Sequence, residues 1–156
     1  MRLHTQDLLQ DNRNLELLRL LRDDPRMGTS ELARRVGMSA PAVRERILRM
    51  EEAGIIRSYR LELDPAALGY PVSAYVRVRP TPGQLPKIAE LARSVPQVVE
   101  CHIMAGECDA LLRVVAKDLD DYRQFQMAHL SRANGVQTVK NDIPLQKIKL
   151  STELPL

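Results

Sequence analysis

Residues 39–59 read SAPAVRERILRMEEAGIIRSY, and this stretch decides how the first third of the chain folds. Val43, Ile47 and Met50 recur at helical spacing, which predicts an amphipathic helix with one apolar face. A helix that only fills a core needs no series of charges on its other positions. Four charged residues nevertheless stand there, namely Arg44, Glu45, Arg46 and Arg49. The rest of the sequence has to explain what these arginines face.

Both ends of this helix carry the usual signals. Ser39 is a favourable N-cap residue, because its hydroxyl can accept a hydrogen bond from a free backbone N–H. Pro41 suits the first turn, where its missing N–H costs nothing. Gly54 is predicted to end the helix.

Two further helices are predicted before it. The leucines of residues 14–27, NLELLRLLRDDPRM, form an apolar stripe that should end before Pro25. Residues 28–38, GTSELARRVGM, predict a short helix that is capped by Thr29 or Ser30 and ended by Gly37.

After these helices, residues 55–65, IIRSYRLELDP, alternate in the manner of a strand. Three helices and a strand make a winged helix-turn-helix, in which the last helix enters the major groove of DNA. The alternative from spacing alone is a plain helical hairpin with exposed arginines.

The distribution of charge favours the DNA-binding alternative. The 156-residue chain has a net charge of +3. Residues 1–60 contain twelve Arg against nine Asp and Glu, whereas residues 61–156 are balanced at eleven of each sign. Such asymmetry suggests a polyanionic partner for the N-terminal part. Only 3% of the residues are aromatic, which argues against a base-stacking platform for single strands.

The helix-turn-helix geometry predicts a set of DNA contacts at the start of the last helix, along its charged side and on the wing. They are Ser39, Ala40, Pro41, Ala42, Arg44, Glu45, Arg46, Arg49, Arg57 and Arg60.

The second part of the chain has a different pattern. Residues 72–80 alternate as a strand, 83–95 as a helix, 98–105 and 109–116 as two strands, 118–132 as a helix capped by Asp118, and 136–150 as a last strand bent near Pro144. This β-α-β-β-α-β order is the ferredoxin-like arrangement. Both helices would cover one face of the sheet, so a second copy of the chain is expected on the other.

The predicted class is therefore α+β. We expect a DNA-binding domain over residues 1–62, a linker over 63–71 with Pro65 and Gly69 as breakers, and a ferredoxin-like domain over 72–156.

The turn around Gly106 has two interpretations. In Ala-Gly-Glu-Cys-Asp, a two-residue hairpin turn would place Ala105 opposite Cys108, and Cys101 opposite about Leu112. Two separate free thiols are then favoured over a redox switch. The segment is either an ordinary turn or part of a small-molecule pocket in which Asp109 and backbone groups bind an ammonium or carboxylate group.

Other site types find no support in the sequence. The three histidines lack metal-ligand spacing, and no phosphate loop or nucleophile motif is present, so we expect no catalytic residues, no metal and no cofactor. A secretory segment or long apolar run is absent as well. These features predict a cytoplasmic protein that is not an enzyme and has no membrane partner.

The chain resembles the Lrp/AsnC transcriptional regulators over nearly its whole length. The resemblance rests on ELARRVGMSAPAVRERILRMEEAGIIRSY, LDPAALGY, VVECHIMAGECDALLRVVAKDLDDY, GVQTV and the ending TELPL. It implies a regulator that binds double-stranded DNA and senses an amino acid or related metabolite. It also implies homodimers that assemble into tetramers or octamers, with DNA affinity modulated through contacts between dimers.

The resemblance also implies an effector site at the Gly-x-x-Asp turn and at the loop and strand beside it. By similarity this site comprises Ala105, Gly106, Glu107, Cys108, Asp109, Gly135, Val136 and Thr138. The family usually has an aromatic residue at the position of Cys108, so a different effector or a weaker response is a further possibility.

Two rival functions make different predictions. A metabolic enzyme that uses the second domain for regulation would need catalytic groups. A chromatin-compacting protein would bind all DNA sequences alike and ignore amino acids.

Overall fold

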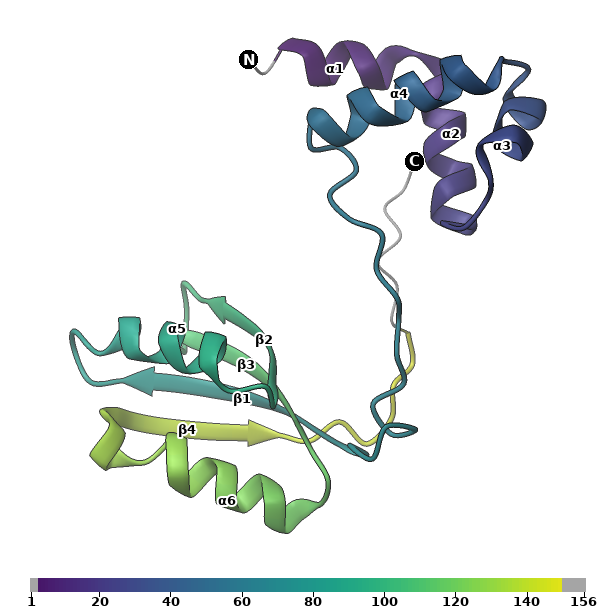
Figure 1. The fold of residues 1–156 in the computed structure, drawn as a ribbon. Coiled ribbons are helices and arrows are strands. Elements are labelled where there is room, and N and C mark those ends of the chain that lie inside the picture. Colours follow the sequence, from purple (N-terminus) through teal and green to yellow (C-terminus); the bar gives the residue numbers. More distant parts are fainter. Residues whose placement is uncertain (1–2, 150–156) are drawn as a thin grey trace. The chain divides into compact units, whose positions relative to one another are not determined.

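The computed structural model describes residues 3–149, with side chains from residue 5 onward, and the ending TELPL lies outside these residues. The chain forms two compact units, the first ending at Leu61 and the second beginning at Glu62. The first contains α1 (Leu3–Gln10), α2 (Asn12–Asp23), α3 (Thr29–Val36) and α4 (Ala40–Glu52) (Figure 1). None of the helices between residues 3 and 149 is long and apolar enough to cross a membrane.

The first unit packs around the apolar faces of α2, α3 and α4. Its most deeply buried side chains include Leu17, Leu32, Val43 and Met50. Ile47 is half-buried and packs against this cluster. The apolar stripe predicted for α4 is confirmed.

The turn between α3 and α4 depends on two backbone details. Gly37 adopts the left-handed conformation with φ of 64°, which lets the chain leave α3 sharply. The Ser39 hydroxyl accepts a hydrogen bond from the Ala42 N–H at 3.4 Å and so caps α4 as predicted. The predicted cap of α3 is wrong, because the N-cap residue is Gly28 and no side chain caps the helix.

Two further elements of the first unit differ from the predictions. Residues 55–65 form no strand, because the Ile55 and Ile56 N–H groups donate to the Met50 carbonyl and no strand within residues 3–149 pairs with this segment. The helix α1 was not predicted, since its sequence is polar and has no clear apolar stripe.

The second unit is a four-stranded antiparallel sheet with the strand order β2-β3-β1-β4. Its elements are β1 (Val72–Pro80), α5 (Leu85–Ser94), β2 (Val98–Ile103), β3 (Ala110–Ala116), α6 (Leu119–His129), the short 3-10 helix η1 (Arg132–Asn134) and β4 (Val136–Asp142). The predicted α+β class and the β-α-β-β-α-β order are confirmed.

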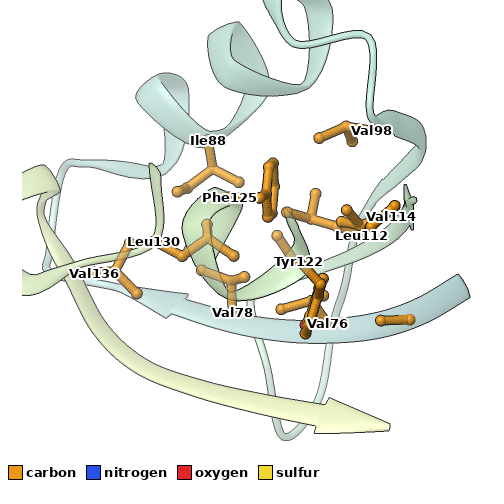
Figure 2. Packing of buried hydrophobic residues seen from close by; sticks show 13 residues of the cluster. Val76, Val78, Ile88, Val98, Leu112, Val114, Tyr122, Phe125, Leu130 and Val136 are labelled. Carbon is orange, nitrogen blue, oxygen red and sulfur yellow. The ribbon is translucent and has the colours of Figure 1, made fainter. Parts of the chain in front are cut away.

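The core of this unit lies between one face of the sheet and the two helices. Figure 2 shows Ile88 of α5 and Phe125 of α6 pointing toward the buried side chains of the strands. Along β1, Ala74, Val76 and Val78 point into this core and alternate with exposed residues. The Asp118 carboxylate caps α6 by accepting from the Asp121 N–H at 2.7 Å, as predicted.

The hairpin between β2 and β3 is longer than predicted. Ile103 pairs with Ala110, and the loop between them is closed by a hydrogen bond from the Met104 N–H to the Asp109 carbonyl at 2.9 Å. Ala105 and Cys108 therefore lie in the loop and not in the paired strands. Cys101 does lie opposite Leu112 as predicted, and both cysteines are free. The last strand also ends earlier than predicted, at Asp142.

Replacing Phe125 by alanine should test the core. Phe125 is only 3% exposed, so Phe125→Ala should lower the free energy of unfolding by about 3–5 kcal/mol. Met127 lies on the same helix and is 67% exposed, so Met127→Ala should change it by less than about 0.5 kcal/mol. Urea unfolding followed by circular dichroism measures both, and equal losses would show that α6 does not pack as described.

Candidate functional site

The arginines at the surface of α4 differ in their surroundings. Arg44 is exposed and has no ion-pair partner among residues 5–149. Arg49 is also exposed, and it pairs with Glu45 one turn earlier on the same helix. Arg57 and Arg60 follow the helix on an exposed segment. Three of these cations can therefore meet an anion without breaking an ion pair, namely Arg44, Arg57 and Arg60.

Arg46 is placed differently from the other predicted DNA contacts. Its guanidinium donates from Nη1 to the Asp11 carboxylate at 2.5 Å and to the Asn14 side-chain oxygen at 2.8 Å. Asn14 also donates from its amide nitrogen to the Leu8 carbonyl at 2.8 Å. Arg46 thus ties α4 to α2 and, through Asn14, to the end of α1.

This small network is well satisfied. Asn14 is 1% exposed and is the one buried polar residue within the described part of the chain. Asp11 accepts a further hydrogen bond from the Arg13 N–H at 2.9 Å, which caps α2. The hydrogen bond from Arg46 is the main cause that lowers the pKa of Asp11 below its ordinary value. The carboxylate therefore stays ionised in the folded protein down to a lower pH than in the unfolded chain.

A groove of about 800 Å³ lies beside this network, between α1, α2 and α4. Ala42, Glu45, Arg46 and Arg49 line it from α4, and Asp7 and Asp11 are among the residues on the other side. On a helix with 3.6 residues per turn, Arg44 lies away from this groove. The contacts predicted for α4 are therefore divided between two sides of the helix.

The sheet of the second unit offers a second polar site, on the face opposite the core. Arg77 and Arg79 of β1 and Lys140 of β4 gather there around a small hollow of about 80 Å³. The other lining residues are Glu107, Cys108 and Thr138. Register explains the grouping, because Arg79 pairs with Thr138 and Arg77 pairs with Lys140 across neighbouring strands.

The loop from Met104 to Asp109 is fastened to this hollow. The Asp109 N–H donates to the Val78 carbonyl at 3.1 Å, and a guanidinium N–H of Arg79 donates to the Glu107 carbonyl. The loop backbone is thus held against β1 at two points.

The structure brings together only part of the predicted effector site. Glu107, Cys108 and Thr138 share the hollow, whereas Ala105 and Gly106 lie on the exposed part of the loop. The remaining predicted residues are Asp109, Gly135 and Val136. The backbone of Asp109 closes the loop, Val136 is buried in the core, and the Gly135 carbonyl accepts from the Thr81 N–H at 2.8 Å.

Sequence reasoning missed the three cations of the hollow. The signal was present in VSAYVRVRP, because strict alternation places Arg77 and Arg79 on the same face, opposite the buried valines. The contribution of Lys140 depends on the pairing of β4 with β1, which no short stretch of sequence displays.

Comparison with known proteins decides the family. A family model described as Lrp/AsnC ligand binding domain matches residues 73–154, and one described as winged helix-turn-helix DNA-binding matches residues 10–57. The chain belongs to the Lrp/AsnC family. Its resemblance to that family, its α+β class and its winged helix-turn-helix assignment are confirmed.

Several relatives extend along nearly the whole chain. The leucine-responsive regulatory protein of Rhizobium meliloti is 37% identical over 139 residues, which covers 87% of this chain and 89% of the relative. The Bkd operon transcriptional regulator of Pseudomonas aeruginosa is 35% identical over 149 residues, which covers 94% of this chain and 97% of the relative. Among solved structures, a transcriptional regulator from Neisseria meningitidis in complex with L-Met has a TM-score of 0.87 at 29% identity, covering 93% of this chain and 96% of that one.

These findings fix the broad function. The chain is a transcriptional regulator of the Lrp/AsnC family, with a DNA-binding helix-turn-helix and a ligand-binding domain, and it is not an enzyme. No cluster of metal-binding side chains is present within the described residues.

Removing the Asn14 side chain should loosen α4. In Asn14→Ala, the Leu8 carbonyl and one side of the Arg46 guanidinium lose their partner, so the free energy of unfolding should fall by about 1–3 kcal/mol. Asn12→Ala is the matched control, because Asn12 is exposed on the same helix and its side chain makes no hydrogen bond within residues 5–149. Urea titration of both variants checks this, and similar stabilities would contradict a structural role for the network.

Proposed function

We propose that this regulator places the start of α4 in the major groove of double-stranded DNA and binds an amino acid or related small metabolite beside the Met104–Asp109 loop. Ligand binding would change how dimers of the chain associate and thereby alter DNA affinity. The observation that carries the DNA-binding part is Arg44, an exposed cation on the second helix of a helix-turn-helix that has no ion-pair partner among residues 5–149.

The contacts divide into three groups under this proposal. Residues Ser39–Ala42 bring the amino end of α4 to the DNA, where the positive end of the helix dipole favours a phosphate. Arg44 contacts a phosphate or a guanine edge from the first turns of the helix. Arg57 and Arg60 contact the DNA backbone from the segment that follows.

Arg46 has a different role in this proposal from the other arginines. Two hydrogen bonds from Nη1, to Asp11 and Asn14, hold its guanidinium against α2. We therefore propose that Arg46 orients α4, and that Glu45 and Arg49 reach DNA only after their mutual ion pair opens. This revises the assignment of Arg46 made from spacing alone.

The effector part rests on the ligand-binding domain and on the loop geometry. Glu107, Cys108 and Thr138 border a hollow next to a loop that two hydrogen bonds fasten to β1. A related regulator was solved with L-Met bound, which supports an amino acid or a similar molecule as the effector. Homodimers and larger assemblies of dimers are part of the proposal, since the outer face of the sheet has no covering element among residues 3–149.

Salt dependence should separate Arg44 from Arg46. If Arg44 contacts a phosphate, Arg44→Ala should weaken binding to specific and random DNA alike. The slope of the logarithm of the DNA-binding constant against the logarithm of the salt concentration should then become shallower by about 1. Arg46→Ala should leave the slope unchanged and lower stability, because it breaks the bonds to Asp11 and Asn14. Fluorescence anisotropy at several salt concentrations measures both.

Arg19 provides the control for this experiment. It is an exposed arginine on α2 that forms no ion pair within residues 5–149, so Arg19→Ala should bind DNA as the unmodified protein does. A reduced slope for Arg46→Ala together with a normal slope for Arg44→Ala would reverse the two assignments.

The effector response should be visible in DNA titrations. We expect tighter binding to the fragment upstream of the protein's own gene than to random DNA of equal length, and a shift of that affinity when a pool of amino acids and their oxo acids is added. Subdividing the pool then identifies the effector. Equal and unresponsive binding to both fragments would instead favour an architectural DNA-binding protein.

A further inference from the structure

The outer face of the sheet concentrates positive charge where the comparisons assign no residue. Arg77, Arg79 and Lys140 line one hollow of about 80 Å³ together with Thr138, Cys108 and Glu107. They come from three separate stretches of the chain, and the pairing of β1 with β4 holds them together.

We propose that this hollow binds the carboxylate groups of a small dicarboxylate, such as an acidic amino acid or a related dicarboxylic acid. The inference rests on the proposed effector function of the Met104–Asp109 loop and adds the chemical class of the effector. It assigns the recognition of the ligand's anionic groups to Arg79 and Lys140.

Arg79 is prepared for such a contact. One of its guanidinium N–H groups donates to the Glu107 carbonyl, which fixes the planar group at the edge of the hollow. Guanidinium has five N–H donors, so others remain for a carboxylate, and a fixed fork suits bidentate binding. Little conformational freedom is then lost when the ligand arrives.

The charge around the hollow calls for more than one carboxylate. Arg77 is paired with Asp142 at 2.8 Å, whereas Arg79 and Lys140 have no carboxylate partner among the described residues. The single acidic residue of the lining is Glu107. An amino acid with a neutral side chain supplies one carboxylate and brings an ammonium group, so it would leave one of these cations unmatched. A second carboxylate removes the mismatch.

Size and overall charge favour a small anion over nucleic acid. The hollow is far too small for a duplex, and residues 61–156 have no net charge. Asp142 and Glu100 pair with Arg77 and Arg113 on this face of the sheet, so these two arginines are already neutralised and offer little attraction to a phosphate backbone. Thr138 adds a neutral hydroxyl that can donate a hydrogen bond to the ligand.

Calorimetric titration of the full-length protein tests the proposal. The ligands are glutamate, malate, leucine and inorganic phosphate, each at neutral pH and constant ionic strength. We expect glutamate or malate to bind at least about tenfold more tightly than leucine and phosphate, since each charge-assisted contact contributes about this factor. Stronger binding of leucine would overturn the proposed class, and stronger binding of phosphate would replace the dicarboxylate by a phosphate ligand.

Variants of the two unpaired cations assign the contacts. Arg79→Gln and Lys140→Gln should each weaken dicarboxylate binding by about tenfold or more. Arg93→Gln and Lys117→Gln are the matched controls, because both side chains are exposed and lie outside the lining of the hollow. Circular dichroism checks that all four variants fold. Unchanged binding in Arg79→Gln and Lys140→Gln would overturn the site.

The result is separable from a failure of the proposed function. If leucine shifts DNA affinity while dicarboxylates neither bind nor shift it, the regulator remains an amino-acid sensor and this inference falls. If no small molecule in the pool changes DNA affinity, the effector function itself fails. Sedimentation analysis tests one more outcome. If Arg79→Gln and Lys140→Gln change the association of the chain but not its affinity for dicarboxylates, the two cations bind a second copy of the chain and the inference is overturned.

Discussion

The alternation of side chains along β1 is the constraint on which the second unit depends. This strand pairs with β3 on one side and β4 on the other, so its backbone hydrogen bonds fix its register twice. Val76 and Val78 must point into the core, and the pleat then forces Arg77 and Arg79 onto the opposite face. A shift by one residue would bury both arginines, which no natural core tolerates without partners. The same sequence pattern therefore builds the core and places the cations of the hollow.

The first unit meets a different constraint, which is to hold a short helix steady enough to read DNA. Apolar packing buries Val43 and Met50 in the core of this unit. The hydrogen bonds from Arg46 to Asp11 and Asn14 oppose rotation of α4 about its axis, because they are directional and connect different helices. Two arginines only two positions apart are thus held differently, since Arg46 is hydrogen-bonded to α2 and Arg44 is exposed to solvent.

Much of the fold could be predicted from local sequence patterns. The capping residues Ser39 and Asp118, the left-handed turn at Gly37 and the inner faces of the helices follow from short-range chemistry, and these predictions are confirmed. The predicted strand over residues 55–65 is wrong, since alternation alone does not supply a partner strand. The strands at the β2–β3 hairpin are also shorter than predicted, since β2 ends at Ile103 and β3 begins at Ala110.

The candidate sites show the same limit more clearly. The charge of α4 was evident from the sequence, but the partner of Arg46 lies 35 residues away, and helical spacing cannot reveal a contact over that separation. The cations of the hollow come from strands that are distant in sequence, so only sheet pairing brings Lys140 to Arg77. Local patterns give the composition of a face, and tertiary pairing decides which faces become sites.

The two cationic sites are built for anions of different size. On α4 and the segment after it, Arg44 and Arg57 are exposed side chains on a part of the chain with a positive net charge, which suits a long polyanion and a steep dependence on salt. In the hollow, Arg79 is tied to a backbone carbonyl, and acidic residues on the same face balance the charge at longer range. Attraction there extends over only a short distance, so it selects a ligand that fits inside. If such a ligand changes the affinity for DNA, DNA must change the affinity for the ligand by the same factor, because the coupling free energy belongs to both sites.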